Sequence, residues 1–114
     1  MKKVIVTGGN GFIGSNLINF LIQKNYLVIN IDKSTYSKNS YILKNLSKRN
    51  YIFYKLDINN KKKILNILKK NKPNAIFNLA AETHVDRSID SPKEFINSNI
   101  CGVFNLLEAI REYK

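Results

Sequence analysis

Cysteine, acidic residues and long apolar runs are all scarce in this sequence. Cys101 is its single cysteine, so no disulfide can form within the chain and no cysteine cluster can bind a metal, which suits a reducing cytoplasm. No apolar run approaches the roughly 18 residues that a membrane span needs, and the apolar start at 4–6 is too short for a signal peptide. The 114 residues fit a single domain, for which we expect no membrane span, no targeting segment and no metal site.

The scarcity of acidic residues leaves a formal net charge of +11, which is common among nucleic-acid-binding proteins. The lysines are nevertheless scattered or lie on outer helix faces, as at 61–63 and 69–70, without neighbouring aromatic residues that could stack on bases. We therefore interpret the positive charge as a solvated surface and expect no nucleic-acid partner.

Strand and helix patterns alternate along the chain. Short β-branched apolar runs predict strands at 2–7, 27–31, 51–55 and 75–78. Apolar residues at helical spacing predict helices at 15–25 and 61–71 and from about 91 to the end, with a shorter one at 42–46 and a loop at 79–91. This alternation predicts an α/β fold with a Rossmann-type, doubly wound parallel sheet of about four strands.

The last predicted helix has apolar residues on more than one side. Its expected inner stripe consists of Ile96, Ile100, Val103, Leu107 and Ile110. Apolar surface outside the stripe is expected from Phe95, Phe104 and Leu106. This second apolar surface suggests that the helix contacts a partner.

A glycine-rich loop, Gly8-Gly9-Asn10-Gly11-Phe12-Ile13-Gly14, joins the first predicted strand to the first predicted helix. Glycines allow the tight turn and let backbone N–H groups approach a pyrophosphate, which the positive end of the helix also favours. The spacing fits both Gly9-x-Gly11-x-x-Gly14 and Gly8-x-x-Gly11-x-x-Gly14, so it leaves two dinucleotide-binding classes open. A merely structural glycine turn is the alternative, which the position between strand and helix disfavours.

Asp32 follows the second predicted strand, where a carboxylate can accept hydrogen bonds from the adenosine ribose and would repel a 2′-phosphate. This position favours NAD over NADP, although Lys33 beside it could accompany a phosphate. For Asp32 the alternative is a solvated carboxylate at a strand end. Asp57 and Ile58 follow the third strand and are similarly placed to meet the adenine with a carboxylate and a backbone amide.

Several segments carry a resemblance to a known family. Residues 7–14 resemble the extended short-chain dehydrogenase/reductase superfamily, and residues 32–36 and 79–88 resemble the dTDP-glucose 4,6-dehydratases within it. Residues 95–102 continue the likeness, which covers the whole chain and corresponds to the N-terminal portion of that family. Ser98 stands where the family commonly has threonine and Thr83 where it commonly has serine, so both positions keep a hydroxyl.

The resemblance implies that NAD is the cofactor and that most of its contacts lie in these segments. With the glycines of the loop, the predicted cofactor-binding residues are Gly8, Gly11, Phe12, Ile13, Gly14, Asp32, Lys33, Ser34, Thr35, Asp57, Ile58, Leu79, Ala80, Ala81, Glu82, Thr83 and Ser98. Thr83 is also a candidate for contact with the nucleotide-sugar substrate, as are His84 and Arg87. His84 could act as a base, but we favour a substrate-lining role. Arg87 could bind a diphosphate or pair with Asp86 or Asp90.

The family's reaction uses NAD transiently: hydride leaves the sugar C4, water is eliminated across C5 and C6, and hydride returns to C6. The family relies on a tyrosine with a lysine four residues later on one helix face and on an adjacent aspartate and glutamate. The only such tyrosine–lysine spacing here is Tyr51 to Lys55, in a predicted strand where four residues span about 13 Å, and we reject it as a catalytic pair. No Asp-Glu pair exists. We therefore expect no catalytic residue in this chain and one NAD-binding domain, 1–114, that ends before the catalytic half.

Four hypotheses about function remain open. The first is the N-terminal part of a dTDP-glucose 4,6-dehydratase, inactive by itself and forming a homodimer in a full-length form. A related nucleotide-sugar epimerase or decarboxylase is the second, and a stand-alone NAD-binding module without chemistry is the third. A basic nucleic-acid binder is the last. For the chain alone we also expect the strand at 75–78 to be an exposed sheet edge that favours instability or association.

Overall fold

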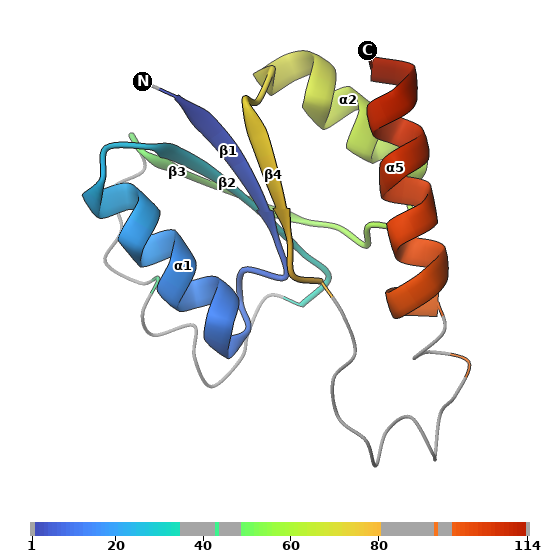
Figure 1. The fold of residues 1–114 in the computed structure, drawn as a ribbon, viewed down its shortest axis with the longest axis horizontal. Helices are drawn as coiled ribbons and strands as arrows, with labels where there is room; N and C mark the ends of the chain where they lie inside the picture. Colours follow the sequence, from blue (N-terminus) through green and yellow to red (C-terminus); the bar gives the residue numbers. More distant parts are fainter. Residues whose placement is uncertain (1, 35–42, 44–48, 81–92, 94–96, 114) are drawn as a thin grey trace.

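A four-stranded parallel sheet forms the centre of the computed structural model, which describes residues 2–34, 43, 49–80, 93 and 97–113. The strands are β1 (Lys3–Thr7), β2 (Leu27–Asp32), β3 (Tyr51–Lys55) and β4 (Ala75–Asn78), in the order β3-β2-β1-β4 (Figure 1). In the register, Ile5 lies between Ile29 of β2 and Ile76 of β4. The predicted Rossmann-type fold is confirmed.

Helices cover both faces of the sheet. Helix α1 (Phe12–Gln23) lies on one face, and α2 (Lys61–Asn71) and α5 (Gly102–Tyr113) lie together on the other (Figure 1). A π-helical turn, η2 (Asn97–Cys101), leads directly into α5. Because each central strand is buried on both faces, β1 and β2 are apolar almost throughout, as the sequence predicted.

Alternate residues of β1 and β2 belong to two separate hydrophobic clusters. Val4, Val6 and Val28 pack with the side chains of α1. Ile5, Ile29 and Ile31 pack under α2 and α5. The two clusters anchor the layers on opposite sides of the sheet, and this leaves the ends of the strands free to form a site.

Most predicted boundaries agree with the structure, and the exceptions have local causes. β3, α2 and β4 have the predicted bounds, and α2 begins where the Asn60 Oδ1 accepts a hydrogen bond from the Lys63 N–H at 3.3 Å. The first helix begins at Phe12 rather than Ser15 and ends at Gln23, since the chain turns at Asn25 with φ of 67°. Of the predicted helix at 42–46 the structure describes only Leu43, which is buried, and the start of the last helix near 91 lies outside the described residues.

The predicted inner stripe of the last helix is wrong by about one residue's rotation. Leu106 and Ala109 are the buried residues, whereas Ile100 and Leu107 are 63% and 59% exposed. Val103 and Ile110 lie at the edges of the buried face. The helix is apolar on several sides, so periodicity alone does not fix its phase, and the wider π-helical turn before α5 shifts the face that follows it.

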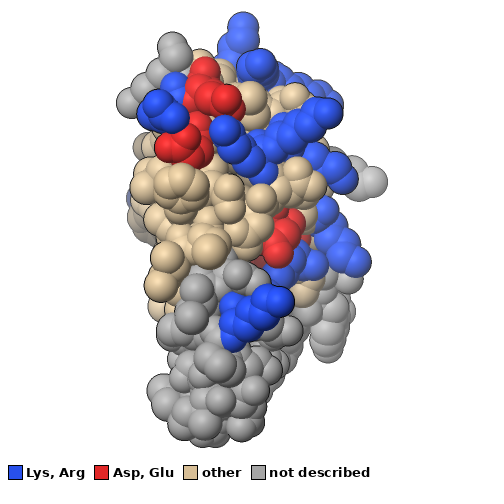
Figure 2. All heavy atoms as spheres, turned by 90° about the vertical axis from the view of Figure 1, so that its right-hand side faces the viewer, with Lys and Arg blue, Asp and Glu red and all other residues tan. Residues whose placement is uncertain are grey.

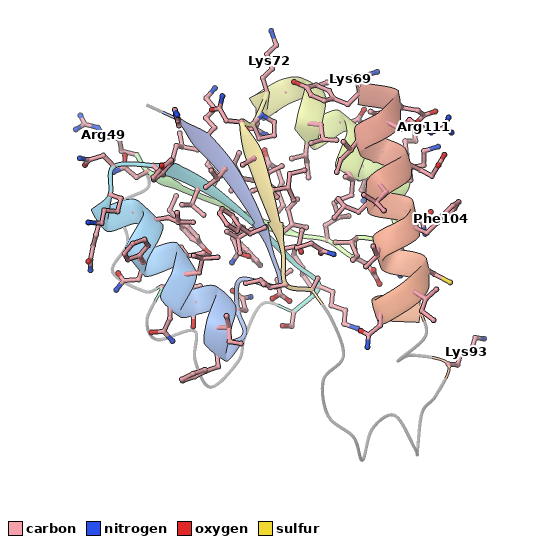
Figure 3. The ribbon with its side chains drawn as sticks, viewed as in Figure 1. Arg49, Lys69, Lys72, Lys93, Phe104 and Arg111 are labelled. Carbon is pink, nitrogen blue, oxygen red and sulfur yellow. The ribbon has the colours of Figure 1, made fainter. Side chains whose placement is uncertain are left out.

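Charged side chains lie on the outside of the described part. Figure 2 shows lysine and arginine side chains spread over the face that carries α2 and α5, with acidic side chains among them. In Figure 3, Arg49, Lys69, Lys72 and Arg111 point away from the sheet in different directions. The ion pair between Lys61 and Glu112, at 3.2 Å, is exposed, and such pairs contribute about 0–1 kcal/mol. Among the described helices, none is long and apolar enough to cross a membrane.

Candidate cofactor-binding site

The carboxyl ends of the parallel strands meet at one edge of the sheet. Here β1 runs into the glycine loop, β2 ends at Asp32, β3 is followed by Asp57, and β4 is followed by Leu79. From β1 the chain builds β2 and β3 on one side and β4 on the other, so the strand order reverses beside β1. In open α/β sheets a ligand binds outside the strand ends at such a switch point.

The glycine loop is folded tightly against its own helix. Gly8 has a φ of 71°, in the region that favours glycine. A Cβ atom at Gly14 would lie 2.3 Å from the carbonyl oxygen of Gly8 and 2.7 Å from the Cα of Gly9. The spacing of these glycines therefore reflects close backbone packing, which sets the position of the start of α1.

Four successive N–H groups of the loop are used inside the protein. The Gly8 N–H donates to the Ile31 carbonyl at 2.8 Å, and the Gly11 N–H donates to the Gly8 carbonyl at 3.2 Å. The N–H groups of Gly9 and Asn10 donate to side chains of β2. The donors left for an anion are those of the first turn of α1, at the exposed residues Phe12 and Ile13, because the first N–H groups of a helix lack intrahelical acceptors.

Asp32 presents an oriented carboxylate beside this turn. Its Oδ2 accepts from the Asn10 N–H at 3.0 Å, and its Oδ1 accepts from the Ser34 N–H at 3.0 Å and the Ser34 Oγ at 3.1 Å. A carboxylate can accept about four hydrogen bonds, so these three leave room for a ribose hydroxyl. Lys33 is exposed and follows directly in sequence.

The other described candidates lie at the same edge. The exposed Asp57 accepts from the Asn59 N–H at 2.9 Å through Oδ1, whereas the Ile58 side chain is buried in the core, so only the backbone of Ile58 can face a ligand. On the other side of β1, the Leu79 N–H donates to the Thr7 carbonyl at 3.1 Å and the Ala80 N–H donates to the Thr7 Oγ1 at 3.2 Å. The structure thus places the glycine loop, Asp32, Asp57 and Ala80 along the carboxyl edge of the sheet.

Several predicted site residues lie outside the described residues. They are Thr35, Ala81, Glu82, Thr83, His84 and Arg87. The backbone of Ser98 lies in η2, directly before α5, but its side chain also belongs to this group. Their predicted contacts remain predictions.

Tyr51 and Lys55 begin and end β3, as expected, so the two side chains are separated along an extended strand. The Tyr51 hydroxyl accepts a hydrogen bond from the Asn30 Nδ2 at 2.9 Å. Burial raises the pKa of Tyr51, and the Asp32 charge adds to this although the Asn30 hydrogen bond opposes it. A tyrosine that acts as a base needs a lowered pKa, which is the opposite of the shift at Tyr51.

Two polar residues of the site were missed by the sequence reasoning. Asn30 is fully buried in β2 and binds the glycine loop, and the hydroxyl of Thr7 donates to the Asn78 Oδ1 and so ties the ends of β1 and β4 together. A signal was present for Asn30, because an amide inside an apolar strand must find buried partners.

Comparisons with known proteins identify relatives of this chain. A family model described as GDP-mannose 4,6 dehydratase matches residues 5–114. The chain is 45% identical to the dTDP-glucose 4,6-dehydratase of Haemophilus influenzae, covering 99% of this chain and 34% of the relative, and 43% identical to dTDP-glucose 4,6-dehydratase 1 of Escherichia coli, covering 97% and 31%. It therefore spans about a third of the length of these relatives.

Two solved structures are also similar. A dTDP-glucose 4,6-dehydratase from Streptomyces venezuelae, determined with NAD bound, superposes with a TM-score of 0.86 at 30% identity, covering 97% of this chain and 36% of that one. A UDP-glucose 4-epimerase from Thermotoga maritima superposes with a TM-score of 0.84 at 35% identity, covering 97% and 34%. The four-stranded sheet matches part of the nucleotide-binding fold of both enzymes.

Proposed function

Because this chain belongs to the GDP-mannose 4,6 dehydratase family, we propose that it binds NAD at the carboxyl edge of its sheet, as the N-terminal part of a dTDP-glucose 4,6-dehydratase. One observation carries the proposal. The glycine loop leads directly into the first turn of α1, and within the loop the Asn10 N–H donates to the Asp32 carboxylate at 3.0 Å, so both groups adjoin the loop. These are the two groups that a dinucleotide needs for its pyrophosphate and its adenosine ribose.

In this proposal each described residue has a physical role in holding the cofactor. The backbone at Phe12 and Ile13 donates to the pyrophosphate at the positive end of α1. Asp32 accepts from the ribose hydroxyls, and its charge disfavours the 2′-phosphate of NADP. Asp57 and the Ile58 amide meet the adenine beyond the end of β3, and Leu79 and Ala80 line the cofactor beyond the end of β4.

The remaining contacts are proposed from the family resemblance. Lys33, Ser34, Thr35, Ala81, Glu82 and Ser98 complete the NAD site. Thr83, His84 and Arg87 face the nucleotide sugar. When bound, NAD supplies a hydride acceptor that is regenerated within the reaction. The residues of this chain bind and orient it, and none of the described residues forms a catalytic tyrosine–lysine pair.

The proposal extends to the whole enzyme. Residues 1–114 form the cofactor-binding domain, which does not convert dTDP-glucose to dTDP-4-keto-6-deoxyglucose by itself. The full-length form works in the cytoplasm as a homodimer that covers the exposed residues Ile100, Phe104 and Leu107 of the last helical segment. In Figure 3, Phe104 points away from the sheet, as a residue of such an interface would.

Titration calorimetry of the chain with NAD and with NADP tests the cofactor assignment. We expect NAD to bind at least about tenfold more tightly, a difference of about 1.4 kcal/mol, and Asp32→Ala to remove most of this preference. The matched control is Asn16→Ala on the exposed side of α1, where the Asn16 side chain donates to the Phe12 carbonyl of its own helix, and this variant should leave both affinities unchanged. Tighter binding of NADP, or no binding of either cofactor, would refute the proposal.

A nucleotide-sugar epimerase is the second candidate, because the epimerase from Thermotoga maritima has nearly the same fold over this chain. The two curated relatives, both dTDP-glucose 4,6-dehydratases at 45% and 43% identity, favour the first candidate, although the solved dehydratase is 30% identical and the solved epimerase 35%. A full-length form should release a 4-keto-6-deoxy sugar from dTDP-glucose. Epimerised UDP-glucose without dehydration would instead support the epimerase, and NAD binding with neither reaction would support a module without chemistry.

A further inference from the structure

Asn30 is a polar residue in the middle of a buried apolar strand. Its side chain is 0% exposed, on the face of β2 that α1 covers, between the positions of Val28 and Asp32. Burying an amide is unfavourable unless its polar atoms find hydrogen-bond partners. The cost of burying the Asn30 amide must therefore be offset by the hydrogen bonds that the amide makes.

Both polar atoms of the Asn30 amide are hydrogen-bonded. The Oδ1 accepts from the Gly9 N–H at 3.0 Å, and the Nδ2 donates to the Asn10 Oδ1 at 3.0 Å and to the Tyr51 hydroxyl at 2.9 Å. Two of the three partners belong to the glycine loop. The contact is direct, because a Cβ atom at Gly9 would lie 2.1 Å from the Asn30 Oδ1.

The hydrogen bonds continue from Asn30 to the ribose side of the proposed site. The Asn10 N–H donates to the Asp32 Oδ2 at 3.0 Å, and the Asn10 Nδ2 donates to the carbonyl of Ser34. The Asn10 side chain thus accepts a hydrogen bond from Asn30, and the Asn10 backbone N–H donates one to the Asp32 carboxylate. The glycine loop and Asp32 are joined by one network that begins at Asn30.

We propose that Asn30 is a positioning residue for the cofactor. Its amide holds Gly9 and Asn10 so that the first-turn N–H groups of α1 and the Asp32 carboxylate keep the separation that one dinucleotide requires. The inference rests on the proposed NAD binding. Without the amide the Gly9 N–H would lack an acceptor in a buried place, and the loop would have to be ordered when the cofactor binds, which weakens affinity.

The opposing interpretation is that Asn30 merely stabilises the fold. A second buried asparagine, which lies away from the glycine loop, allows the two interpretations to be distinguished. Asn71 on α2 is also buried, at 8% exposure, and its Nδ2 donates to the Tyr54 hydroxyl at 3.4 Å and to the Ile67 carbonyl at 3.0 Å. It therefore has the same chemistry and a tyrosine partner, but no contact with the glycine loop in the described part of the chain. Asn30→Leu and Asn71→Leu each replace a buried amide with an apolar side chain of similar size.

The experiment measures urea unfolding and the NAD affinity of each variant, at a temperature where both are folded. Asn30→Leu should weaken NAD binding at least about tenfold, which corresponds to about 1.4 kcal/mol. Asn71→Leu should lower stability while changing the NAD affinity less than about twofold. Asn10→Ala removes the side-chain link but keeps the backbone bond to Asp32, and should weaken binding about threefold.

Folded Asn30→Leu with the wild-type affinity would overturn the inference and leave the proposed function intact. An equal loss of affinity in Asn71→Leu would also overturn it, since the effect would then follow stability. If Asn30→Leu does not fold, Asn10→Ala decides, and wild-type affinity in that variant overturns the inference. Failure of the wild-type chain to bind NAD would refute the proposed function, and the positioning role with it.

Discussion

Replacing Gly14 by alanine should damage the fold and the proposed NAD site together. The new Cβ atom would lie 2.3 Å from the Gly8 carbonyl oxygen and 2.7 Å from the Gly9 Cα, and these backbone atoms cannot move without moving the loop. Overpacking of this kind costs about 1–3 kcal/mol, of which the helix preference of alanine returns up to about 1 kcal/mol. We expect a net loss of about 1–2 kcal/mol in the free energy of unfolding and NAD binding that is weaker by at least about tenfold.

Gly11→Ala is the matched variant, because among the described residues a Cβ atom there meets only the Gly8 carbonyl oxygen, at 3.4 Å. The backbone at Gly11 has φ of −76° and ψ of 177°, which alanine adopts readily. Its stability should change by less than about 1 kcal/mol, since a poorer N-cap is offset by a less flexible unfolded chain. The methyl group would, however, enter the space proposed for the pyrophosphate, and NAD binding should fall about tenfold.

Urea unfolding followed by far-ultraviolet circular dichroism gives the stabilities, and titration calorimetry gives the NAD affinities. The two variants should separate, with Gly14→Ala losing both properties and Gly11→Ala losing binding alone. A Gly14→Ala variant as stable as the wild type would refute the packing argument. Wild-type NAD affinity in Gly11→Ala would refute the placement of the pyrophosphate above the start of α1.

Three further predictions concern other parts of the chain. Burial raises the pKa of Tyr51 above 10.0, so the stability that its neutral hydroxyl contributes is present below pH 10.0 and is lost as the pH rises through the folded pKa. Tyr51→Phe should therefore make the fall in the free energy of unfolding above pH 10.0 shallower in urea titrations, and an unchanged slope would contradict the raised pKa. Asn105→Ala removes the hydrogen bonds from Nδ2 to the Asn59 Oδ1 and to the Cys101 carbonyl and should cost about 1 kcal/mol in urea unfolding. Glu108→Gln weakens the exposed pair with Arg111 and should cause no resolvable change in the same assay. Phe77 is 40% exposed on β4, which pairs only with β1 among the described strands and so presents a sheet edge. Phe77→Lys should reduce the concentration-dependent association seen in sedimentation velocity, and a wild-type chain that stays monomeric at all concentrations would refute this.

The elements that could be predicted from the sequence are those whose patterns have one interpretation. α2 has apolar residues on one side and a capping asparagine, and β3 and β4 are short apolar runs next to turn residues, so their bounds were predicted correctly. The start of α1 was missed because Phe12 and Ile13 point to solvent and do not continue the apolar stripe that begins further along the helix. The phase of α5 was missed because apolar residues surround that helix.

In the candidate site, too, some features could be predicted from the sequence and others could not. The glycine loop and Asp32 could be placed from the sequence, because a loop after a first strand and a carboxylate after the neighbouring strand reach the same sheet edge in this fold. The roles of individual N–H groups could not, since they depend on acceptors that folding brings together. Asn30 is 21 residues from Gly9, and only the pairing of β1 with β2 places them within hydrogen-bond distance.

By itself, the sequence determined the order of strands and helices, the parallel sheet and the position of the nucleotide-binding loop, because hydrophobic periodicity, turn residues and the glycine spacing are local properties of the chain. Only the tertiary structure decided which face of α5 is buried, which N–H groups of the glycine loop are left for a ligand, and that the Asn30 side chain is hydrogen-bonded to that loop. These depend on the packing of distant segments, where a rotation of one residue or a buried hydrogen bond changes which groups face the site.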